Sequence, residues 1–159
     1  MDAGMVFGLI FTICVMAMIL FFGLDQIADF FGFGTETQVH RELKEVAQDV
    51  DRIYNMAENS GEPHTLSIPE STKICFFNSS NPSPRIYADD SISWKPDAAF
   101  RTIIKSEGYN TWYYAGSKRG GYAIHNLDMP SDKNFCAPGG TRVYITRMYN
   151  GVVIEPILE

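Results

Sequence analysis

Two cysteines in the polar part of the chain, Cys75 and Cys136, carry the clearest chemistry in the sequence. Distant cysteines in a domain outside the cytoplasm most simply form one disulfide, and two free buried thiols are the main alternative. Closing a loop of about 60 residues would stabilise the fold by roughly 4 kcal/mol. A metal site is disfavoured because there is no C-x-x-C motif and no histidine at ligand spacing from a cysteine. Cys14 lies apart in an apolar run, so we expect it to remain a lone thiol.

The remaining candidates for acid–base or metal chemistry are the paired acids in ADD (88–90) and His125 in YAIHNL. The acids lie on a predicted turn, where solvated carboxylates are usual and a weak cation site is the alternative. His125 has no visible partner that would make it a general base. The sequence contains no G-x-S-x-G, no H-E-x-x-H and no Gly-rich phosphate loop. We therefore predict no enzyme activity, no catalytic residue, and no cofactor or metal.

Charge and one sequence triplet bear on partners and compartment. The formal net charge is −6, and nucleic-acid binding would require a basic surface, so we exclude nucleic acid as a partner. The triplet NSS at 78–80 fits the N-glycosylation pattern, which makes Asn78 a possible glycosylation site in an extracellular protein.

The chemistry must be positioned by elements that begin with an apolar run, GMVFGLIFTICVMAMILFFG (4–23). The uncharged stretch from 3 to 24 would form roughly 33 Å of helix, enough to cross a hydrocarbon core of about 30 Å. A cleavable signal peptide is disfavoured because the preceding residues are acidic and no small-residue cleavage site follows. A transmembrane anchor fits in length, but the first basic residue is Arg41, so either a basic leader has been removed or the usual orientation signal is missing.

The third interpretation of this run is a helix that leaves the membrane to pack against copies of itself. Gly4 and Gly8 form a G-x-x-x-G pair, and Ala17 adds a further small residue. Val15 lies in the middle of the run. We therefore predict an assembly helix within residues 1–34, with residues 25–34 as a joint to the next element.

An amphipathic helix is predicted within residues 35–61. Thr35 and Gln38 fit a capping box, and the sequence NSGEP (59–63) would end the helix. The apolar positions recur at helical spacing: Val39, Leu43, Val46, Val50, Ile53 and Ala57. We expect this stripe to pack on the domain that follows; packing against neighbouring copies is the alternative.

Residues 62–159 read as a β-rich domain, because short β-branched and aromatic runs alternate with turn residues. The candidate strands are 65–77, 84–88, 100–105, 110–115, 121–127, 141–149 and 152–158. The sequence YNGV (149–152) predicts a hairpin with a type I′ turn, and GSKRGG (116–121) predicts a longer hairpin loop. The predicted fold class is α+β: a long apolar N-terminal helix, an amphipathic helix, and an antiparallel, sandwich-like domain able to fold alone.

This order of parts resembles the type IV pilin-like superfamily with class III signals, and its archaeal members in particular. Bacterial pilins carry a glutamate at the fifth mature position, where this sequence has Met5. The segments LSIPESTKICFF and NLDMPSDKNFCAPGGTRVYITRMYNGVVI also resemble single-pass secreted proteins of small archaeal genomes. In the pilin-like family the apolar helix is held in the membrane and then moves into the core of a helical filament, while the β domain faces outward.

The resemblance implies a structural protein on the cell surface. We expect a subunit of an extracellular type IV pilus-like filament, with copies of itself as partners, the membrane as a station before assembly, and cell adhesion as a role without an indicated target. The alternative is a single-pass, membrane-anchored extracellular module that binds a partner or belongs to an envelope complex.

Overall fold

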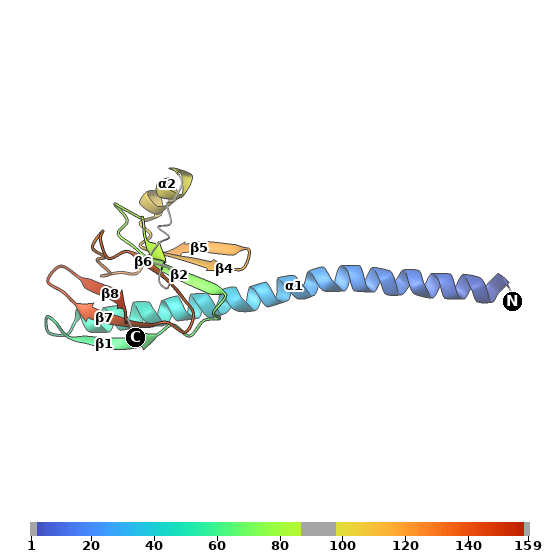
Figure 1. The fold of residues 1–159 in the computed structure, drawn as a ribbon, viewed down its shortest axis with the longest axis horizontal. Helices are drawn as coiled ribbons and strands as arrows, with labels where there is room; N and C mark the ends of the chain where they lie inside the picture. Colours follow the sequence, from blue (N-terminus) through green and yellow to red (C-terminus); the bar gives the residue numbers. More distant parts are fainter. Residues whose placement is uncertain (1–2, 87–97, 158–159) are drawn as a thin grey trace. The chain divides into compact units, whose positions relative to one another are not determined.

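The computed structural model describes residues 3–86 and 98–157, which form two helices and eight strands (Figure 1). In chain order they are α1 (Ala3–Tyr54), β1 (Gly61–Thr65), β2 (Thr72–Phe76), β3 (Arg85–Ile86), α2 (Ala98–Glu107), β4 (Thr111–Ala115), β5 (Lys118–Tyr122), β6 (Phe135–Pro138), β7 (Arg142–Arg147) and β8 (Val152–Pro156). The chain divides into two compact units, Met1–Gly34 and Thr35–Glu159.

Helix α1 contains both of the helices that the sequence predicted. It is assigned without a break from Ala3 to Tyr54, so Thr35 lies within the helix and does not cap a new one. The predicted joint at 25–34 is helical because it contains no proline, and a glycine costs only about 1 kcal/mol in a helix interior. The chain leaves the helix through a turn in which Asn59 adopts a positive φ of 65°.

The predicted fold class needs correction at its N-terminal end. The apolar run does not form a long apolar helix of its own, because it is the first part of an element whose later turns are rich in charged residues. Within the residues that the structure describes, no helix combines the length and hydropathy that a membrane crossing requires.

The amphipathic stripe of α1 forms one side of the main core, as predicted. Five of its six apolar residues are fully buried: Val39, Leu43, Val46, Val50 and Ile53. They share one cluster with buried residues of both sheets, including Ile74, Tyr113 and Ile145. Ala57 is exposed because α1 has already ended at Tyr54. The stripe therefore belongs to the same folding unit as the strands.

Two sheets replace the predicted sandwich. An antiparallel three-stranded sheet has the order β1-β7-β8, and a five-stranded sheet has the order β3-β6-β2-β4-β5, in which only the β3–β6 pair is parallel. Alternation along β2 sends Ile74 and Phe76 to the main core, whereas Cys75 joins a second cluster with Ile104 of α2. The main core on one face of the five-stranded sheet includes residues of α1, and the second cluster on the other face includes Ile104 of α2. Helices therefore pack on both faces of this sheet, and the domain is not the predicted sandwich of two sheets.

Segment 100–105 is helical in α2 and not a strand, because Phe100 and Ile104 at i and i+4 face the same cluster. The first candidate strand, 65–77, contains all of β2 and only the last residue of β1, Thr65. Candidate strand 84–88 extends beyond the described residues, which give only the two-residue strand β3.

Both predicted hairpins exist, but with other turns, and β5 begins inside the predicted loop 116–121 and includes only the first two residues of candidate strand 121–127. Four residues, 148–151, connect β7 to β8, and neither Asn150 nor Gly151 has a positive φ, so the turn is not type I′. A Cβ at Gly151 would lie 2.6 Å from the Cβ of Asp128, so close packing explains this glycine. The β4–β5 loop has only two residues, with a φ of +61° at Gly116, as at the first position of a type II′ turn.

Candidate assembly surface and buried polar cluster

The first part of α1 presents an apolar surface to solvent. Every residue between 4 and 20 whose side chain is described is exposed. The large apolar side chains among them are Val6, Phe7, Ile10, Phe11, Ile13, Val15, Met16, Met18, Ile19 and Leu20, with exposed fractions from 38% at Val15 to 73% at Phe7. Successive helical residues point about 100° apart, so the consecutive residues 18–20 alone cover most of the circumference. Residues 4–20 are called the apolar segment below.

The predicted assembly residues all lie in the apolar segment. Gly4 and Gly8 are one turn apart on one face, and a Cβ added to either would meet no atom within 4 Å. The hydroxyl of Thr12 donates a hydrogen bond of 2.8 Å to the carbonyl of Gly8 on the preceding turn, so this polar group finds its partner within the helix. Val15 and Ala17 are exposed as well. The structure therefore leaves the small-residue face open to close approach by another helix.

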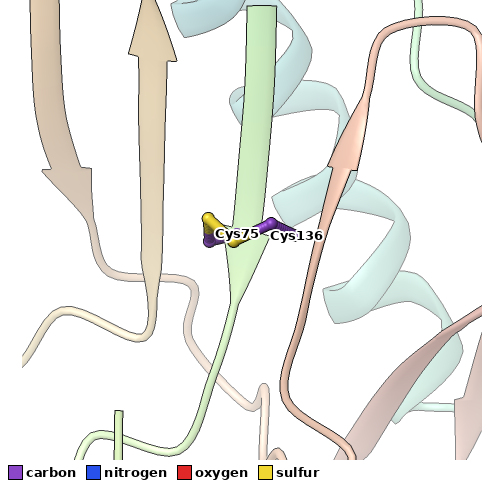
Figure 2. Close-up of a disulfide and its surroundings, with 2 residues drawn as sticks. All are labelled: Cys75 and Cys136. Atoms are coloured by element: carbon purple, nitrogen blue, oxygen red, sulfur yellow. A yellow bond between two sulfur atoms is a disulfide. The ribbon is translucent and has the colours of Figure 1, made fainter. Parts of the chain in front are cut away.

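The predicted disulfide between Cys75 and Cys136 is present (Figure 2). The two residues are directly opposite each other on the antiparallel strands β2 and β6, and both are buried. They pack with Trp112 and Ile104 in the second cluster, which also explains why α2 covers this face of the sheet. Cys14 is a free, exposed thiol.

We expect mass spectrometry of the non-reduced protein to show Cys75 and Cys136 linked and only Cys14 alkylated. The paired Cys75→Ser and Cys136→Ser variant should lose roughly 2–5 kcal/mol in the free energy of unfolding, as is typical when a small extracellular domain loses a native disulfide. Alkylation of all three cysteines without reductant would contradict the assignment. Cys14→Ser is the matched control and should unfold at the denaturant concentration of the parent protein.

Asn78, the possible glycosylation site, has a structural role in the fold. Its side-chain nitrogen donates to the carbonyl of Met129 at 2.7 Å, and its side-chain oxygen accepts from the amide of Ser80 at 2.9 Å. Its own amide donates to Asn134, a buried side chain. These bonds fix the loop after β2, and glycosylation at Asn78 stays a prediction.

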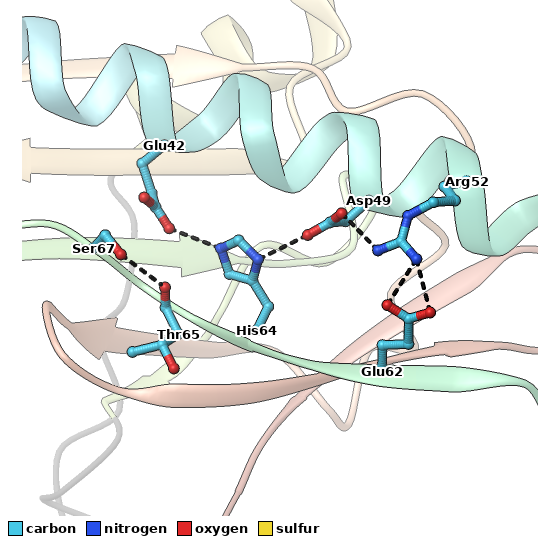
Figure 3. Close-up of polar contacts among 7 residues, drawn as sticks. All are labelled: Glu42, Asp49, Arg52, Glu62, His64, Thr65 and Ser67. Atoms are coloured by element: carbon cyan, nitrogen blue, oxygen red, sulfur yellow. Dashed lines mark hydrogen bonds and ion pairs between the residues drawn. The ribbon is translucent and has the colours of Figure 1, made fainter.

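A cluster of charged side chains between α1 and β1 has no counterpart in the sequence predictions (Figure 3). One ring nitrogen of His64 lies 2.8 Å from a carboxylate oxygen of Glu42, and the other lies 2.8 Å from Asp49. Arg52 continues the cluster, with one bond of 2.8 Å to Asp49 and two of 2.7 Å to Glu62. The Glu42 side chain is only 2% exposed and that of His64 14%.

Local geometry explains how the charged cluster forms. Glu42 and Asp49 are seven residues apart, so two turns of α1 place them on one face. Glu62 and His64 are two apart on β1 and share the face of the strand that lies against α1. The sequence does contain two acids seven residues apart, Glu42 and Asp49, and an acid and a histidine two residues apart, Glu62 and His64. Nothing local to either segment indicates that the two pairs meet.

This cluster does not have the features of a catalytic or metal site. Because both ring nitrogens of His64 face carboxylates, neither is available to take a proton from a substrate. No group of three potential metal ligands is found in the described ranges 3–86 and 98–157. His125 is exposed, and the paired acids at 88–90 lie outside the described residues.

Comparisons of this chain with protein-family models, with curated proteins and with solved structures found no match.

Proposed function

We propose that this protein is a structural subunit of an extracellular, type IV pilus-like filament, and that copies of it assemble through the apolar segment of α1. The observation that carries the proposal is the exposure of apolar side chains around the whole circumference of the helix. A helix that is apolar on all sides is normally covered on all sides, whether by protein or by lipid. A continuous exposed surface of ten large apolar side chains usually marks an interaction site.

The all-round distribution favours several neighbours over one. In a dimer each helix would cover one side of its partner and leave the other side in water. In a helical array, each apolar segment is surrounded by other copies, and fully burying a Phe, Leu or Met side chain contributes about 1.5–3 kcal/mol. Gly4 and Gly8 would let one neighbour approach closely, since nothing occupies the space around them.

The second compact unit supports an outward-facing domain. Thr35–Glu159 has its own core, which takes in the stripe of α1, so it does not depend on the apolar segment for burial. Its Cys75–Cys136 disulfide favours an oxidising compartment, because such bonds are rare where thiols are kept reduced. Both features agree with a filament whose surface is formed by this unit.

The proposal is tested by removing detergent from the purified full-length chain and imaging the product by electron microscopy. We expect long filaments of constant diameter from the full chain, and none from a fragment that contains only residues 35–159. A full-length chain that remains monomeric in buffer would overturn the proposal. A chain that stays monomeric and enters lipid vesicles would instead support the membrane-anchored module.

A further inference from the structure

His64 is the main point at which β1 is joined to α1. Strand β1 lies at the edge of the three-stranded sheet and pairs only with β7. In the described part of the chain, the buried apolar cores include no residue of β1. Polar contacts join this strand to α1, from His64 to Glu42 and Asp49 and from Glu62 to Arg52.

The geometry at His64 requires a specific protonation state. A carboxylate can only accept hydrogen bonds, and a neutral imidazole has one N–H. Since both ring nitrogens lie 2.8 Å from carboxylate oxygens, both contacts are hydrogen bonds only when His64 is protonated. On deprotonation one of the two contacts loses its proton: either the almost fully buried Glu42 is left without a donor, or a ring lone pair faces Asp49, which keeps its bond from Arg52.

We propose that His64 is a pH-dependent latch, which holds β1 against α1 while it is protonated and releases the strand when it loses its proton. Both outcomes are unfavourable, because a buried carboxylate without a donor, or a ring lone pair 2.8 Å from a carboxylate oxygen, destabilises the closed interface, so the interface opens to admit water or a carboxylate takes up a proton. Opening is the easier response because β1 is an edge strand whose own residues lie outside the buried core, which the chain enters at Leu66, after the strand has ended.

Electrostatics favour the closed state at pH values below the raised pKa of His64. The hydrogen bond to Glu42 raises the pKa of His64 above its ordinary value of 6.5, against desolvation, and Asp49 adds to the rise. The protonated form therefore stabilises the fold fully below pH 6.5, and this contribution is lost as pH rises through the folded-state pKa. Burial acts to raise the pKa of Asp49, but its bonds to Arg52 and His64 lower it overall.

The other charged groups around the latch do not replace the lost proton. On α1, Arg52 is held by Asp49 and Glu62, and Arg41 pairs with Glu45 on the exposed side. On β7 the residue opposite His64 is the buried Val143, and its neighbours Arg142 and Tyr144 alternate to the other face. His64 is therefore the only cation that contacts Glu42 among the ion pairs of the described residues.

The test uses the full-length chain, kept dispersed in mild detergent, and two measurements. NMR titration should give His64 a pKa above 6.5, and the folding equilibrium constant should fall about tenfold across the titration for each unit of that elevation. Hydrogen exchange of the β1 amides, corrected for the intrinsic pH dependence, should accelerate over the same pH range while that of the β4 amides does not.

Two variants separate a latch from a passive contact. His64→Gln cannot take a proton, so it should lose this pH dependence and show fast β1 exchange already at pH 6. His125→Gln, which changes an exposed histidine, should behave like the parent protein. A His64 pKa at or below 6.5, or an unchanged pH dependence in His64→Gln, would overturn the proposal. The wild-type titration alone decides the matter if His64→Gln fails to fold.

Discussion

Val15→Glu is expected to abolish filament formation while the unit 35–159 keeps its fold and its disulfide. Val15 lies in the middle of the apolar segment, where a filament would surround each helix with other copies and leave no water for a charge. Burying an unpaired carboxylate costs several kcal/mol or forces it to stay protonated. A penalty of about 4 kcal/mol per subunit would raise the critical concentration for growth about a thousandfold.

The readouts for Val15→Glu are electron microscopy and the alkylation rate of Cys14, the exposed free thiol one position away. Filaments of the parent protein should protect Cys14, and the variant should leave it reactive. Gln48→Glu is the matched control, because it adds the same charge to an exposed position of α1 outside the apolar segment. We expect this control to assemble normally.

Gly8→Leu tests the same surface without adding a charge. It keeps the segment apolar but prevents a close approach of a second helix at the open Gly4–Gly8 face. We expect fewer or shorter filaments. If both Gly8→Leu and Val15→Glu assemble like the parent protein, the apolar segment is not the assembly surface.

A fragment of residues 35–159 is expected to fold cooperatively, whereas a fragment of residues 62–159 is expected to lack a cooperative unfolding transition. The shorter fragment loses the five fully buried residues of the α1 stripe, from Val39 to Ile53. At about 1.5–3 kcal/mol for each side chain, the loss is similar to the whole stability of a typical domain, 5–15 kcal/mol. The structure thus argues against the expectation that residues 62–159 fold alone.

Denaturant titration followed by circular dichroism under oxidising conditions separates the two fragments. Leu43→Ala in the longer fragment supplies an intermediate case, with an expected loss of about 2–5 kcal/mol, because it removes one fully buried side chain. An exposed substitution on the same helix, Gln48→Ala, should change stability by less than about 0.5 kcal/mol. Cooperative unfolding of residues 62–159 would show that the helix stripe is dispensable for folding.

The features that sequence predicted correctly depend on local patterns or simple pairing. The 4–3 spacing from Val39 to Ile53 determines one face of a helix wherever that helix packs. With Cys14 in the apolar run, Cys75 and Cys136 were the natural pair. Helix boundaries were harder, since Thr35 fits a cap equally well whether α1 begins there or continues through it.

The missed features depend on contacts between distant segments. Segment 100–105 contains β-branched residues suited to a strand. It forms a helix because Phe100 and Ile104, four residues apart, both pack into the second cluster with Cys75 and Cys136. The charged cluster joins residues 22 positions apart, Glu42 and His64, and needs β1 to lie beside α1. The type I′ turn predicted at Asn150–Gly151 does not form, since the loop has four residues and Gly151 packs closely against Asp128.

The most direct test of the assembly proposal is a helical reconstruction of the full-length protein by electron cryomicroscopy. We predict a central core built from residues 4–20, in which every apolar segment contacts several copies and Val15 is fully covered by protein. The unit 35–159 should lie outside that core with its Cys75–Cys136 bond intact. A filament held together through the sheets, with the apolar segments outside the contacts between copies, would contradict the account.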